Sequence, residues 1–433
     1  MRRAVTAGVI GNFVEQFDFG IYGYLAPVMA PVFFPSQDPL VAVLSTYAIL
    51  AIGTIIRPLG GMILGRWGDR WGRRTVLLWT ILMMGVGTAL IGMLPTYQQV
   101  GVLAPCLLLL LRCAQSLISG GEYVGAIAFV VEWAEPTRRA YRTSFVSMSV
   151  FFGILGGAGI SALTATLFDP AAMQSYGWRI PFLLALPLSL VGLWVRSRVG
   201  ETPEFQRATN EGAEVTKAPL TEAFKSQWQS MLVFCGASIT LAILSYTWVT
   251  YLPEYLSTNI GLSRAEALGS NAISVAAIIP LLPLAGALSD RIGRRPMLIT
   301  GYASAIAFVP LAFAVAQWGT FTGAVIAQLI YVIPEFFLTG IVTVCVSEMF
   351  ATKTRFSAGG VAYNCSFAVF AGITPFVSTL LVSQTGTIYA VWAFLATAAV
   401  ISLVVVAKWM TETYRVDLST GRPAEPAEQP VRV

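Results

Sequence analysis

The sequence contains no histidine and only five cysteines, so the commonest ligands of a metal site are nearly absent. All five cysteines fall inside apolar runs and no two form a C-x-x-C pair: Cys106, Cys113, Cys235, Cys345 and Cys365. We expect buried, inert thiols rather than metal ligands or disulfides. A catalytic nucleophile–base or metal constellation is hard to assemble without histidine. We therefore expect no enzyme activity, no metal and no cofactor.

Charged residues are also scarce. They make up 11% of the 433 residues, whereas hydrophobic residues make up 56% and gather into long runs. A membrane-spanning helix needs roughly 20 apolar residues. Twelve such runs are centred near Tyr22, Leu50, Met84, Ile118, Ile154, Leu186, Leu244, Ala277, Ile306, Ile333, Phe370 and Ala396. The sequence therefore predicts an all-α membrane protein with twelve transmembrane helices.

The positive charges between these runs predict the orientation. Of the 27 Lys and Arg, 23 fall in the terminal segments and the even-numbered loops, and only Arg179 and Arg264 fall in the odd-numbered loops. Cytoplasmic loops carry the excess of Lys and Arg. We expect a multi-pass protein of the inner (plasma) membrane with both termini cytoplasmic. Short juxtamembrane clusters face anionic lipid, so the pI near 9.0 does not indicate a nucleic-acid partner.

An internal repeat predicts the domain organisation. Residues 65–74, GRWGDRWGRR, recur 221 residues later as residues 286–295, GALSDRIGRR, each between the second and third helix of its half. Internal repeats of this kind are how secondary transporters are built. The predicted segments are an N-terminal six-helix bundle (1–198), a cytoplasmic linker (199–227), a C-terminal six-helix bundle (228–410) and a cytoplasmic tail (411–433).

The repeated G-x-x-x-D-R-x-G-R-R resembles the signature loop of the major facilitator superfamily. A narrower resemblance, to the metabolite:proton symporter family, covers nearly the whole chain. It rests on G-N-x-x-E-x-x-D-F (11–19), RPLGG (57–61), Arg112 with Gln115, SGGE (119–122), GWRIPF (177–182), ETP (201–203), EMF (348–350) and Tyr363-Asn364 with Pro375. The chain differs from the family at Gln16-Phe17, where members usually have Trp-Tyr, and at Ser116, where they usually have glycine. The resemblance implies the major facilitator fold, two pseudo-symmetric bundles that rock about a central site.

Ionisable residues inside two of the runs are candidates for that central site, because a charge at a helix centre costs about 2.5 to 3.5 kcal/mol on insertion scales. Glu15, Asp18 and Tyr22 share one face of the first helix. In the fourth helix, Arg112, Gln115, Ser119 and Glu122 lie within about an 80° sector. We expect Arg112 to meet Asp18 or Glu15. Asp18, Glu15 and Glu122 are the candidates for proton coupling, and the alternative is that they form structural ion pairs.

Further residues are candidates for substrate binding, and each has a structural alternative. Arg57 precedes Pro58 and Glu335 follows Pro334, so either side chain can instead satisfy backbone groups that the proline frees. Aromatic residues in membrane helices are often packing residues or interface anchors. The full predicted binding set is Arg112, Gln115, Tyr22, Arg57, Tyr251, Tyr331, Glu335, Tyr363 and Asn364.

The two copies of the repeat are predicted to form a cytoplasmic gate. An aspartate there can pair with the arginines and with the positive amino end of a facing helix. Such contacts exist in only one of two access states. The predicted gate residues are Gly65, Asp69, Arg70, Gly72, Arg73 and Arg74, with Gly286, Asp290, Arg291, Gly293, Arg294 and Arg295.

The sequence favours a secondary active transporter that takes up a small organic acid or zwitterionic metabolite together with protons, by alternating access. No G-x-x-x-x-G-K-[ST] phosphate loop is present, so ATP is not the expected energy source. The expected partners are a small metabolite, protons and membrane lipid, and we expect a functional monomer. The alternatives are a proton-driven exporter of a small molecule, a channel, or a non-transporting receptor.

The orientation can be tested with thiols introduced into the loops. A cysteine at Gln98 should react with a membrane-impermeant thiol reagent added outside intact cells, whereas a cysteine at Thr137 should not. Labelling at Thr137 but not at Gln98 would reverse the orientation.

Overall fold

The computed structural model describes residues 2–35, 39–202, 206, 224–351, 354–418 and 422–423. The described part is helical apart from an antiparallel two-stranded ribbon, β1 (Val416–Asp417) and β2 (Arg422–Pro423). Parts of the predicted linker (203–205 and 207–223) and of the predicted tail (419–421 and 424–433) lie outside the described residues.

The first half of the chain forms six long helices. They are α1 (Arg2–Phe33), α2 (Pro39–Trp71), α3 (Arg73–Met93), α5 (Leu103–Trp133), α6 (Arg139–Leu167) and α8 (Arg179–Ser197). Short helical segments connect them: α4 (Tyr97–Val100), η1 (Pro136–Arg138), α7 (Pro170–Ala172) and the π-helix η2 (Met173–Gly177).

The second half also forms six spans, three of them interrupted. The uninterrupted ones are α15 (Arg294–Ala316), α16 (Phe321–Glu348) and α19 (Tyr389–Trp409). Two spans contain a π-helical turn: α11 (Trp228–Tyr246) continues through η3 (Thr247–Tyr251) into α12 (Leu252–Thr258), and α17 (Arg355–Ser366) through η4 (Phe367–Ala371) into α18 (Gly372–Thr385). The third interrupted span bends by 41° between α13 (Arg264–Ile278) and α14 (Leu281–Ile292).

Local sequence explains where several of these helices begin and end. Ser263 starts α13 with a capping box, in which its hydroxyl accepts from the Glu266 amide and the Glu266 carboxylate accepts from the Ser263 amide. Pro280 separates α13 from α14, because proline cannot continue the backbone hydrogen bonding of a helix.

The long helices have the dimensions of membrane spans. By length and composition, nine of the described helices could cross a membrane, or ten with the bent α13–α14 pair. Helices α1 and α2 contain 32 and 33 residues, and both carry charged side chains in their interiors, including Asp18 and Arg57. With them the described residues supply six spans in each half, in agreement with the predicted fold class.

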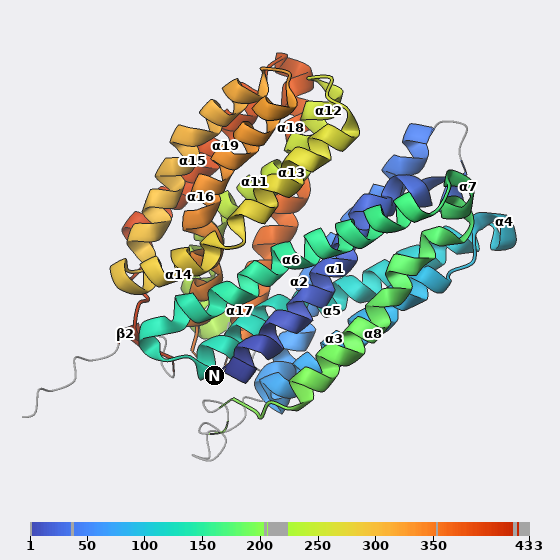
Figure 1. Cartoon of the computed structure of the whole chain (residues 1–433). Coiled ribbons are helices and arrows are strands. Elements are labelled where there is room, and N and C mark those ends of the chain that lie inside the picture. Colours follow the sequence, from blue (N-terminus) through green and yellow to red (C-terminus); the bar gives the residue numbers. More distant parts are fainter. Residues whose placement is uncertain are drawn as a thin grey trace, which may run out of the picture.

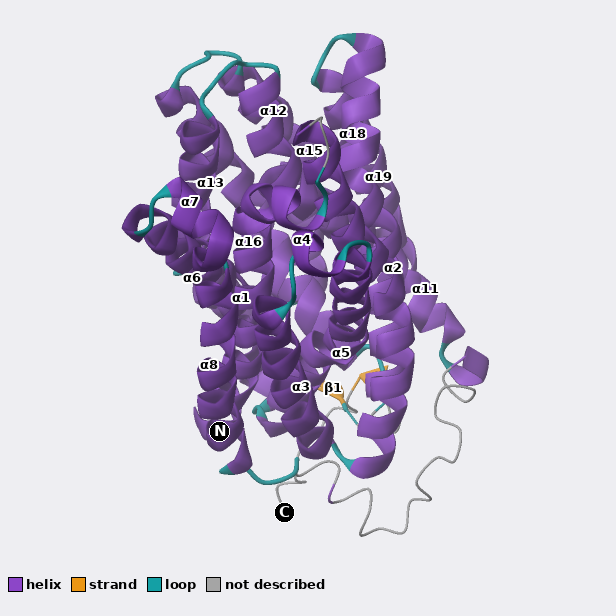
Figure 2. Cartoon of the chain, turned by 90° about the vertical axis from the view of Figure 1, so that its right-hand side faces the viewer, coloured by secondary structure: helices purple, strands orange, loops and turns teal. Residues whose placement is uncertain are grey.

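The two halves form separate bundles that meet at one end. In Figure 1 the blue-to-green bundle and the yellow-to-red bundle converge near the N-terminus and β2 and diverge toward α7 and α12. Figure 2 shows the start of α1 and strand β1 at the same end of the molecule. We call this end the terminal end and the other the opposite end. Near the terminal end α2 packs against α17, and α14 packs against α6.

Candidate functional site

The central feature of the N-terminal bundle is a buried ion pair between α1 and α5. Arg112 donates through Nη1 to Asp18 Oδ2, and the two side chains are 3% and 1% exposed. Thr88 Oγ1 donates to Asp18 Oδ1 at 2.9 Å, and Gln115 Nε2 donates to the same oxygen at 3.3 Å. The Arg112 guanidinium lies 3.9 Å from the centre of the Tyr22 ring. Asp18 is therefore held by one cation and two neutral donors.

Beside this pair lies a cavity of about 10 Å³, enough for about one water molecule. It is lined by Asp18, Phe19, Met84, Arg112, Gln115, Ser116 and Ser119. Among the described residues, Arg112 Nε and Nη2 and Gln115 Oε1 are buried and have no hydrogen-bond partner. One edge of the Arg112 guanidinium thus has two donors available for a ligand, and the Gln115 side-chain oxygen is available as an acceptor.

Glu15 forms a second ion pair one helical turn away. Arg57 Nη2 lies 3.1 Å from Glu15 Oε1, and Ser119 donates to the same oxygen. Glu15 Oε2 is buried and, among the described residues, has no hydrogen-bond partner. The Arg57 guanidinium, 5.6 Å from the centre of the Phe19 ring, joins α2 to this site. Arg57 therefore has a carboxylate partner in addition to any carbonyl that Pro58 frees.

Glu122 lies outside this cluster. Its carboxylate pairs with Arg196 near the end of α8 and accepts a hydrogen bond from Thr80. Arg196 also donates to the carbonyls of Ala7 at 2.7 Å and Leu77 at 2.6 Å. Arg196 is one of the 23 positive charges that the sequence places in terminal segments and even-numbered loops, but its side chain is buried and joins α1, α3, α5 and α8. This geometry is that of a structural ion pair, and a role for Glu122 in proton coupling stays a prediction.

In the C-terminal bundle, Glu335 is a buried carboxyl group that makes no ion pair with any described residue. It accepts hydrogen bonds from Ser245 Oγ at 2.7 Å and from Thr339. One turn earlier on α16, the Tyr331 hydroxyl is buried and has no partner among the described residues. Tyr251 donates to the Ser378 carbonyl at 3.4 Å.

Tyr363 and Asn364 lie where the two bundles touch. The Tyr363 ring stacks on Phe367 at 4.3 Å and lies 5.3 Å from the Tyr123 ring of the other bundle. Asn364 Nδ2 donates to the Gly120 carbonyl on α5 at 2.6 Å and to the Gly360 carbonyl on its own helix at 2.7 Å. The Asn364 amide is thus engaged with backbone across the bundle interface.

At the terminal end, Asp69 caps a helix of the opposite bundle. Its carboxylate accepts from the backbone amides of Phe356 at 3.3 Å and Ser357 at 2.8 Å, in the first turn of α17. Arg73 lies 2.9 Å from the same carboxylate. A carboxylate at a helix N-terminus satisfies orphan amides and interacts favourably with the helix dipole. Asp69 therefore joins α2 of the first half to α17 of the second.

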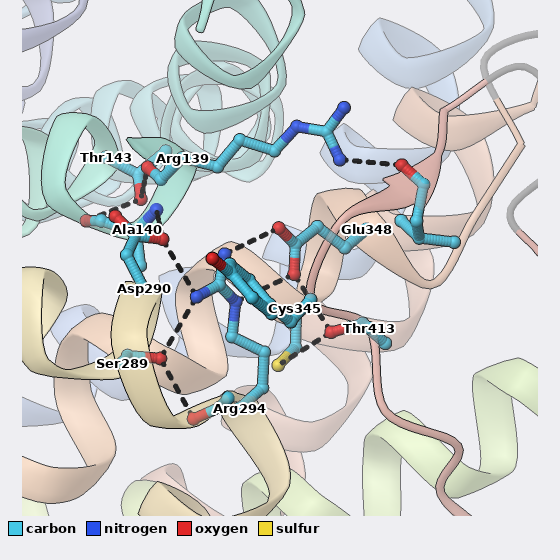
Figure 3. A network of polar contacts seen from close by, with 12 residues as sticks. Arg139, Ala140, Thr143, Ser289, Asp290, Arg294, Cys345, Glu348 and Thr413 are labelled. Atoms are coloured by element: carbon cyan, nitrogen blue, oxygen red, sulfur yellow. Dashed lines mark hydrogen bonds and ion pairs between the residues drawn. The ribbon is translucent and has the colours of Figure 1, made fainter. Parts of the chain in front are cut away.

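The second copy of the repeat makes the reciprocal contact. Asp290 on α14 accepts from the amides of Ala140 at 3.1 Å and Tyr141 at 2.8 Å, in the first turn of α6. Arg294 lies 2.9 Å from Asp290 and 2.9 Å from Glu348. Figure 3 shows Arg294 between these two carboxylates. Each half thus caps one helix of the other half.

The other positions of the repeat also have physical roles. A Cβ on Gly65 would lie 2.8 Å from Ser357 Cα, and one on Gly286 would lie 2.6 Å from the Ala140 carbonyl oxygen, so a side chain would push the bundles apart. Gly72 and Gly293 have φ values of 97° and 100°, which favour glycine. Arg70 is exposed.

In each copy of the repeat, one of the remaining arginines is exposed and the other donates to backbone carbonyls at the end of a helix. Like Arg70, Arg291 is exposed. Arg74 donates to the Ser197 carbonyl at the end of α8, and Arg295 donates to carbonyls at the end of α19.

Four residues at the terminal end were not predicted as site residues. Glu132 accepts from Arg355 at 2.8 Å and from Arg73 at 3.4 Å, and Glu348 binds Arg294. Arg139 is the first residue of α6, and Arg355 is the first residue of α17. The sequence holds a signal for them, because Glu132 precedes Arg139 by seven residues and Glu348 precedes Arg355 by seven.

A repeated Glu-Thr pair completes each half. Glu201 accepts from the amide of Arg74 at the start of α3, and Thr202 donates to Glu132 at 2.6 Å. Glu412 accepts from the amides of Arg294 and Arg295 at the start of α15, and Thr413 donates to Glu348 at 2.9 Å. Burial raises the pKa of the Glu201 carboxyl, and its amide donors oppose that shift.

The Glu122–Arg196 pair makes a testable prediction about stability. Glu122→Gln leaves a buried guanidinium without its carboxylate, which costs about 3 to 5 kcal/mol of folding free energy. The thermal unfolding midpoint of the purified protein in detergent should fall by several degrees. Replacing both Glu122 and Arg196 by Gln should recover part of the loss.

The exposed acid Glu135 provides the control, because Glu135→Gln should leave the midpoint nearly unchanged. If Glu122→Gln unfolds at the wild-type temperature but no longer accumulates substrate, Glu122 acts in proton coupling and not as a structural partner.

Comparison with known proteins identifies the family. A sequence model of the Major Facilitator Superfamily matches residues 8–370. The ectoine/proline transporter ProP of Corynebacterium glutamicum is 36% identical over 402 residues, covering 89% of this chain and 79% of the relative. The proline/betaine transporter of Escherichia coli K12 is 36% identical over 437 residues, covering 98% of this chain and 86% of the relative.

Solved structures share the architecture at low sequence identity. The proton:xylose symporter XylE bound to 6-bromo-6-deoxy-D-glucose aligns with a TM-score of 0.78 and 19% identity, over 96% of this chain and 98% of XylE. The human organic anion transporter MFSD10 aligns with a TM-score of 0.69 and 15% identity, over 94% and 99% of the two chains. Together with the family match, these likenesses establish the fold. The chain belongs to the major facilitator superfamily, as a multi-pass transporter of the plasma membrane and not an enzyme.

Proposed function

We propose that this protein takes up a small zwitterionic solute together with protons. The observation that carries the proposal is a set of buried polar groups without partners among the described residues: the Nε and Nη2 donors of Arg112 and the Oε1 acceptor of Gln115, which line the cavity, and the Oε2 acceptor of Glu15, one helical turn from Asp18. A carboxylate of the solute matches the two Arg112 donors, and a cationic nitrogen of the solute matches the Gln115 and Glu15 oxygens. The relatives named above transport proline, betaine or ectoine, and each of these solutes carries both groups.

Arg112 is the proposed carboxylate ligand. The Nε–Nη2 edge of a guanidinium presents two parallel donors that fit a carboxylate bidentately. Tyr22 stacks on the guanidinium and Asp18 holds Nη1, so the free edge is oriented before substrate arrives. Lysine cannot reproduce this fork, because its ammonium is a single point charge.

Proton coupling follows from competition for Arg112. Substrate carboxylate that binds the guanidinium weakens its hold on Asp18, and a buried carboxylate that loses its cation is favoured in the protonated form. Glu15 is the second candidate for the group that takes up the proton, since it is paired with Arg57 just as Asp18 is paired with Arg112. The substrate and the proton then cross together, because an unpaired buried charge would oppose the conformational change.

The C-terminal bundle supplies the other proposed wall of the binding site. Glu335 has a carboxyl group without a cation among the described residues, and Tyr331 has an unpartnered hydroxyl one turn away. Tyr251, Tyr363 and Asn364 complete this wall when the bundles rearrange around substrate. The transporter acts as a monomer, because both walls come from one chain.

The terminal end is the proposed cytoplasmic gate. The caps that Asp69 and Asp290 form across the bundles hold this end closed, while the bundles diverge at the opposite end (Figure 1). Alternating access requires these caps to break when the cytoplasmic side opens. Export of a hydrophobic cation is the competing function, and a buried arginine beside the cavity disfavours it.

The function can be tested by uptake of radiolabelled proline and glycine betaine into proteoliposomes with a proton gradient. Asp18→Asn should abolish accumulation against the solute gradient but retain solute-for-solute exchange, because exchange needs no net proton movement. Exchange by this variant should be nearly independent of pH. Accumulation that persists in the Asp18→Asn, Glu15→Gln double variant would contradict the assignment of the proton to α1.

Arg112 variants serve as the companion measurement, because they should affect binding itself. Arg112→Ala should abolish binding of both solutes, and Arg112→Lys should restore it poorly. If neither solute is bound or transported by the wild-type protein, while a hydrophobic cation is extruded, the exporter function is correct.

The gate makes a separate prediction. Asp69→Asn keeps the size of the side chain but weakens the cap of α17 and removes one of the two carboxylate partners of Arg73. Uptake should fall severalfold, while the dissociation constant for solute changes by less than about threefold, because Asp69 does not line the cavity. Asp290→Asn should have the same effect, because Asp290 caps α6 as Asp69 caps α17. Glu135 is exposed, and Glu135→Gln should transport normally. Loss of solute binding in Asp69→Asn would exclude a pure gating role.

A further inference from the structure

The chain does not leave the bundle where α19 ends. Residues Met410 to Leu418 turn back beneath the terminal end, and four of them are more than nine-tenths buried. Exposed fractions are 4% for Met410, 4% for Thr413, 3% for Val416 and 5% for Leu418. Arg415 has a positive φ of 60°, where the segment turns into β1. Such burial is unexpected for a cytoplasmic tail that only follows the last span.

The first part of this segment is anchored to its own bundle. Glu412 caps α15, Thr413 donates to Glu348, and the Tyr414 ring lies 5.3 Å from the Arg294 guanidinium. The first two contacts repeat those of Glu201 and Thr202 in the first half. They belong to the pseudo-symmetric plan of the fold and need no further explanation.

The next part of the segment reaches the other bundle. Arg139, the first residue of α6, donates through Nη1 to the Val416 carbonyl at 2.8 Å. Arg355, the first residue of α17, donates through Nη2 to the Leu418 carbonyl at 2.7 Å. Two carbonyls only two residues apart thus bind guanidinium groups from opposite bundles. Figure 3 shows Arg139 extending from α6 toward this segment, beside Thr413 and Glu348.

We propose that Val416–Leu418, named here the strap, is a third component of the gate that holds the two bundles together at the terminal end. Opening that end separates the starts of α6 and α17, so at least one arginine must release the strap. Hydrogen bonds from charged donors are stronger than neutral ones. Losing the strap should therefore shift the equilibrium toward the state that is open at the terminal end, by at least about tenfold. The proposal rests on the proposed gate.

Two truncations separate the strap from the rest of the tail. Deletion of residues 416–433 removes both carbonyl acceptors and keeps Glu412 and Thr413. Deletion of residues 424–433 keeps the strap together with β2, the strand that pairs with it, and is the matched control. Both are made in a chain whose five cysteines are replaced by serine, with spin labels on cysteines introduced at Gln98 and Gln384. These two positions are exposed and lie at the opposite end, one in each bundle.

Electron–electron double resonance then reports the distance between the two labels. Deletion of 416–433 should increase the population with the shorter distance, because the opposite end closes as the terminal end opens. Deletion of 424–433 should leave the distribution of the full-length chain. Equal distributions for the two truncations would overturn the strap.

Point variants keep the test decisive if the longer truncation fails to fold. Arg139→Ala in the full-length chain should also favour the short distance, and no change in the distance would overturn the strap. Where the truncation folds, Arg139→Ala should add little in the chain lacking 416–433. If the effects of Arg139→Ala and of the deletion of 416–433 on the distance are fully additive, Arg139 acts through contacts other than the strap. Asp69→Asn tests the gate in the same assay. If Asp69→Asn shifts the distance and loss of the strap does not, the gate stands and the strap fails; if neither shifts it, both fail.

Discussion

Buried charges in this protein have to be paired, and the choice of partner determines which helices stay together. An ion removed from water costs several kcal/mol unless a counter-charge and hydrogen bonds compensate it. At the terminal end, Asp69 pairs with Arg73 within its half and with helix α17 outside it. Separation of the bundles would break the hydrogen bonds between the Asp69 carboxylate and the first amides of α17, so both groups would lose these partners at the same time. Such a contact is either made or broken, which favours two discrete states over a continuum.

The pseudo-symmetry makes the terminal end cooperative. Asp69 belongs to the first half and holds the second, whereas Asp290 belongs to the second half and holds the first. Glu132 is shared by Arg73 of its own bundle and Arg355 of the other. One rigid-body separation of the bundles would therefore break at once all of these contacts that run from one bundle to the other. A gate made of several coupled contacts opens sharply even when each contact is modest in strength.

The long apolar runs, the repeat and the polar faces of two helices were enough to predict the fold and to bring Asp18, Arg112 and Gln115 together, because helical spacing fixes which side chains share a face. Arg196 could not be placed from the sequence. A charge near the end of an apolar run fits a loop as well as a buried pair, and only the packing of α8 decides. Glu132 and Glu348 were missed for the same reason, although the seven-residue spacing to the next arginine repeats. The strap has no sequence pattern, because its acceptors are backbone carbonyls that every residue possesses.

Helices α2 and α5 connect the cavity to the gate. On α5, Arg112 and Glu132 are twenty residues apart, about 30 Å along a straight helix. On α2, Arg57 and Asp69 are twelve residues apart, about 18 Å. A Cβ on Gly60 would lie 1.9 Å from the Leu117 carbonyl oxygen, so the two backbones are in direct contact.

Gly120 makes the reciprocal approach, since its Cβ would lie 2.2 Å from the Arg57 carbonyl oxygen. Small residues at such crossings let membrane helices pack backbone to backbone, and we infer from this close contact that α2 and α5 move as one unit. A change of partner at Arg112 that tilts α5 therefore also displaces Glu132, and α2 carries Asp69 with it. The proposed coupling between solute, proton and gate needs no chain of side-chain rearrangements, because helices α2 and α5 carry both ends of the connection.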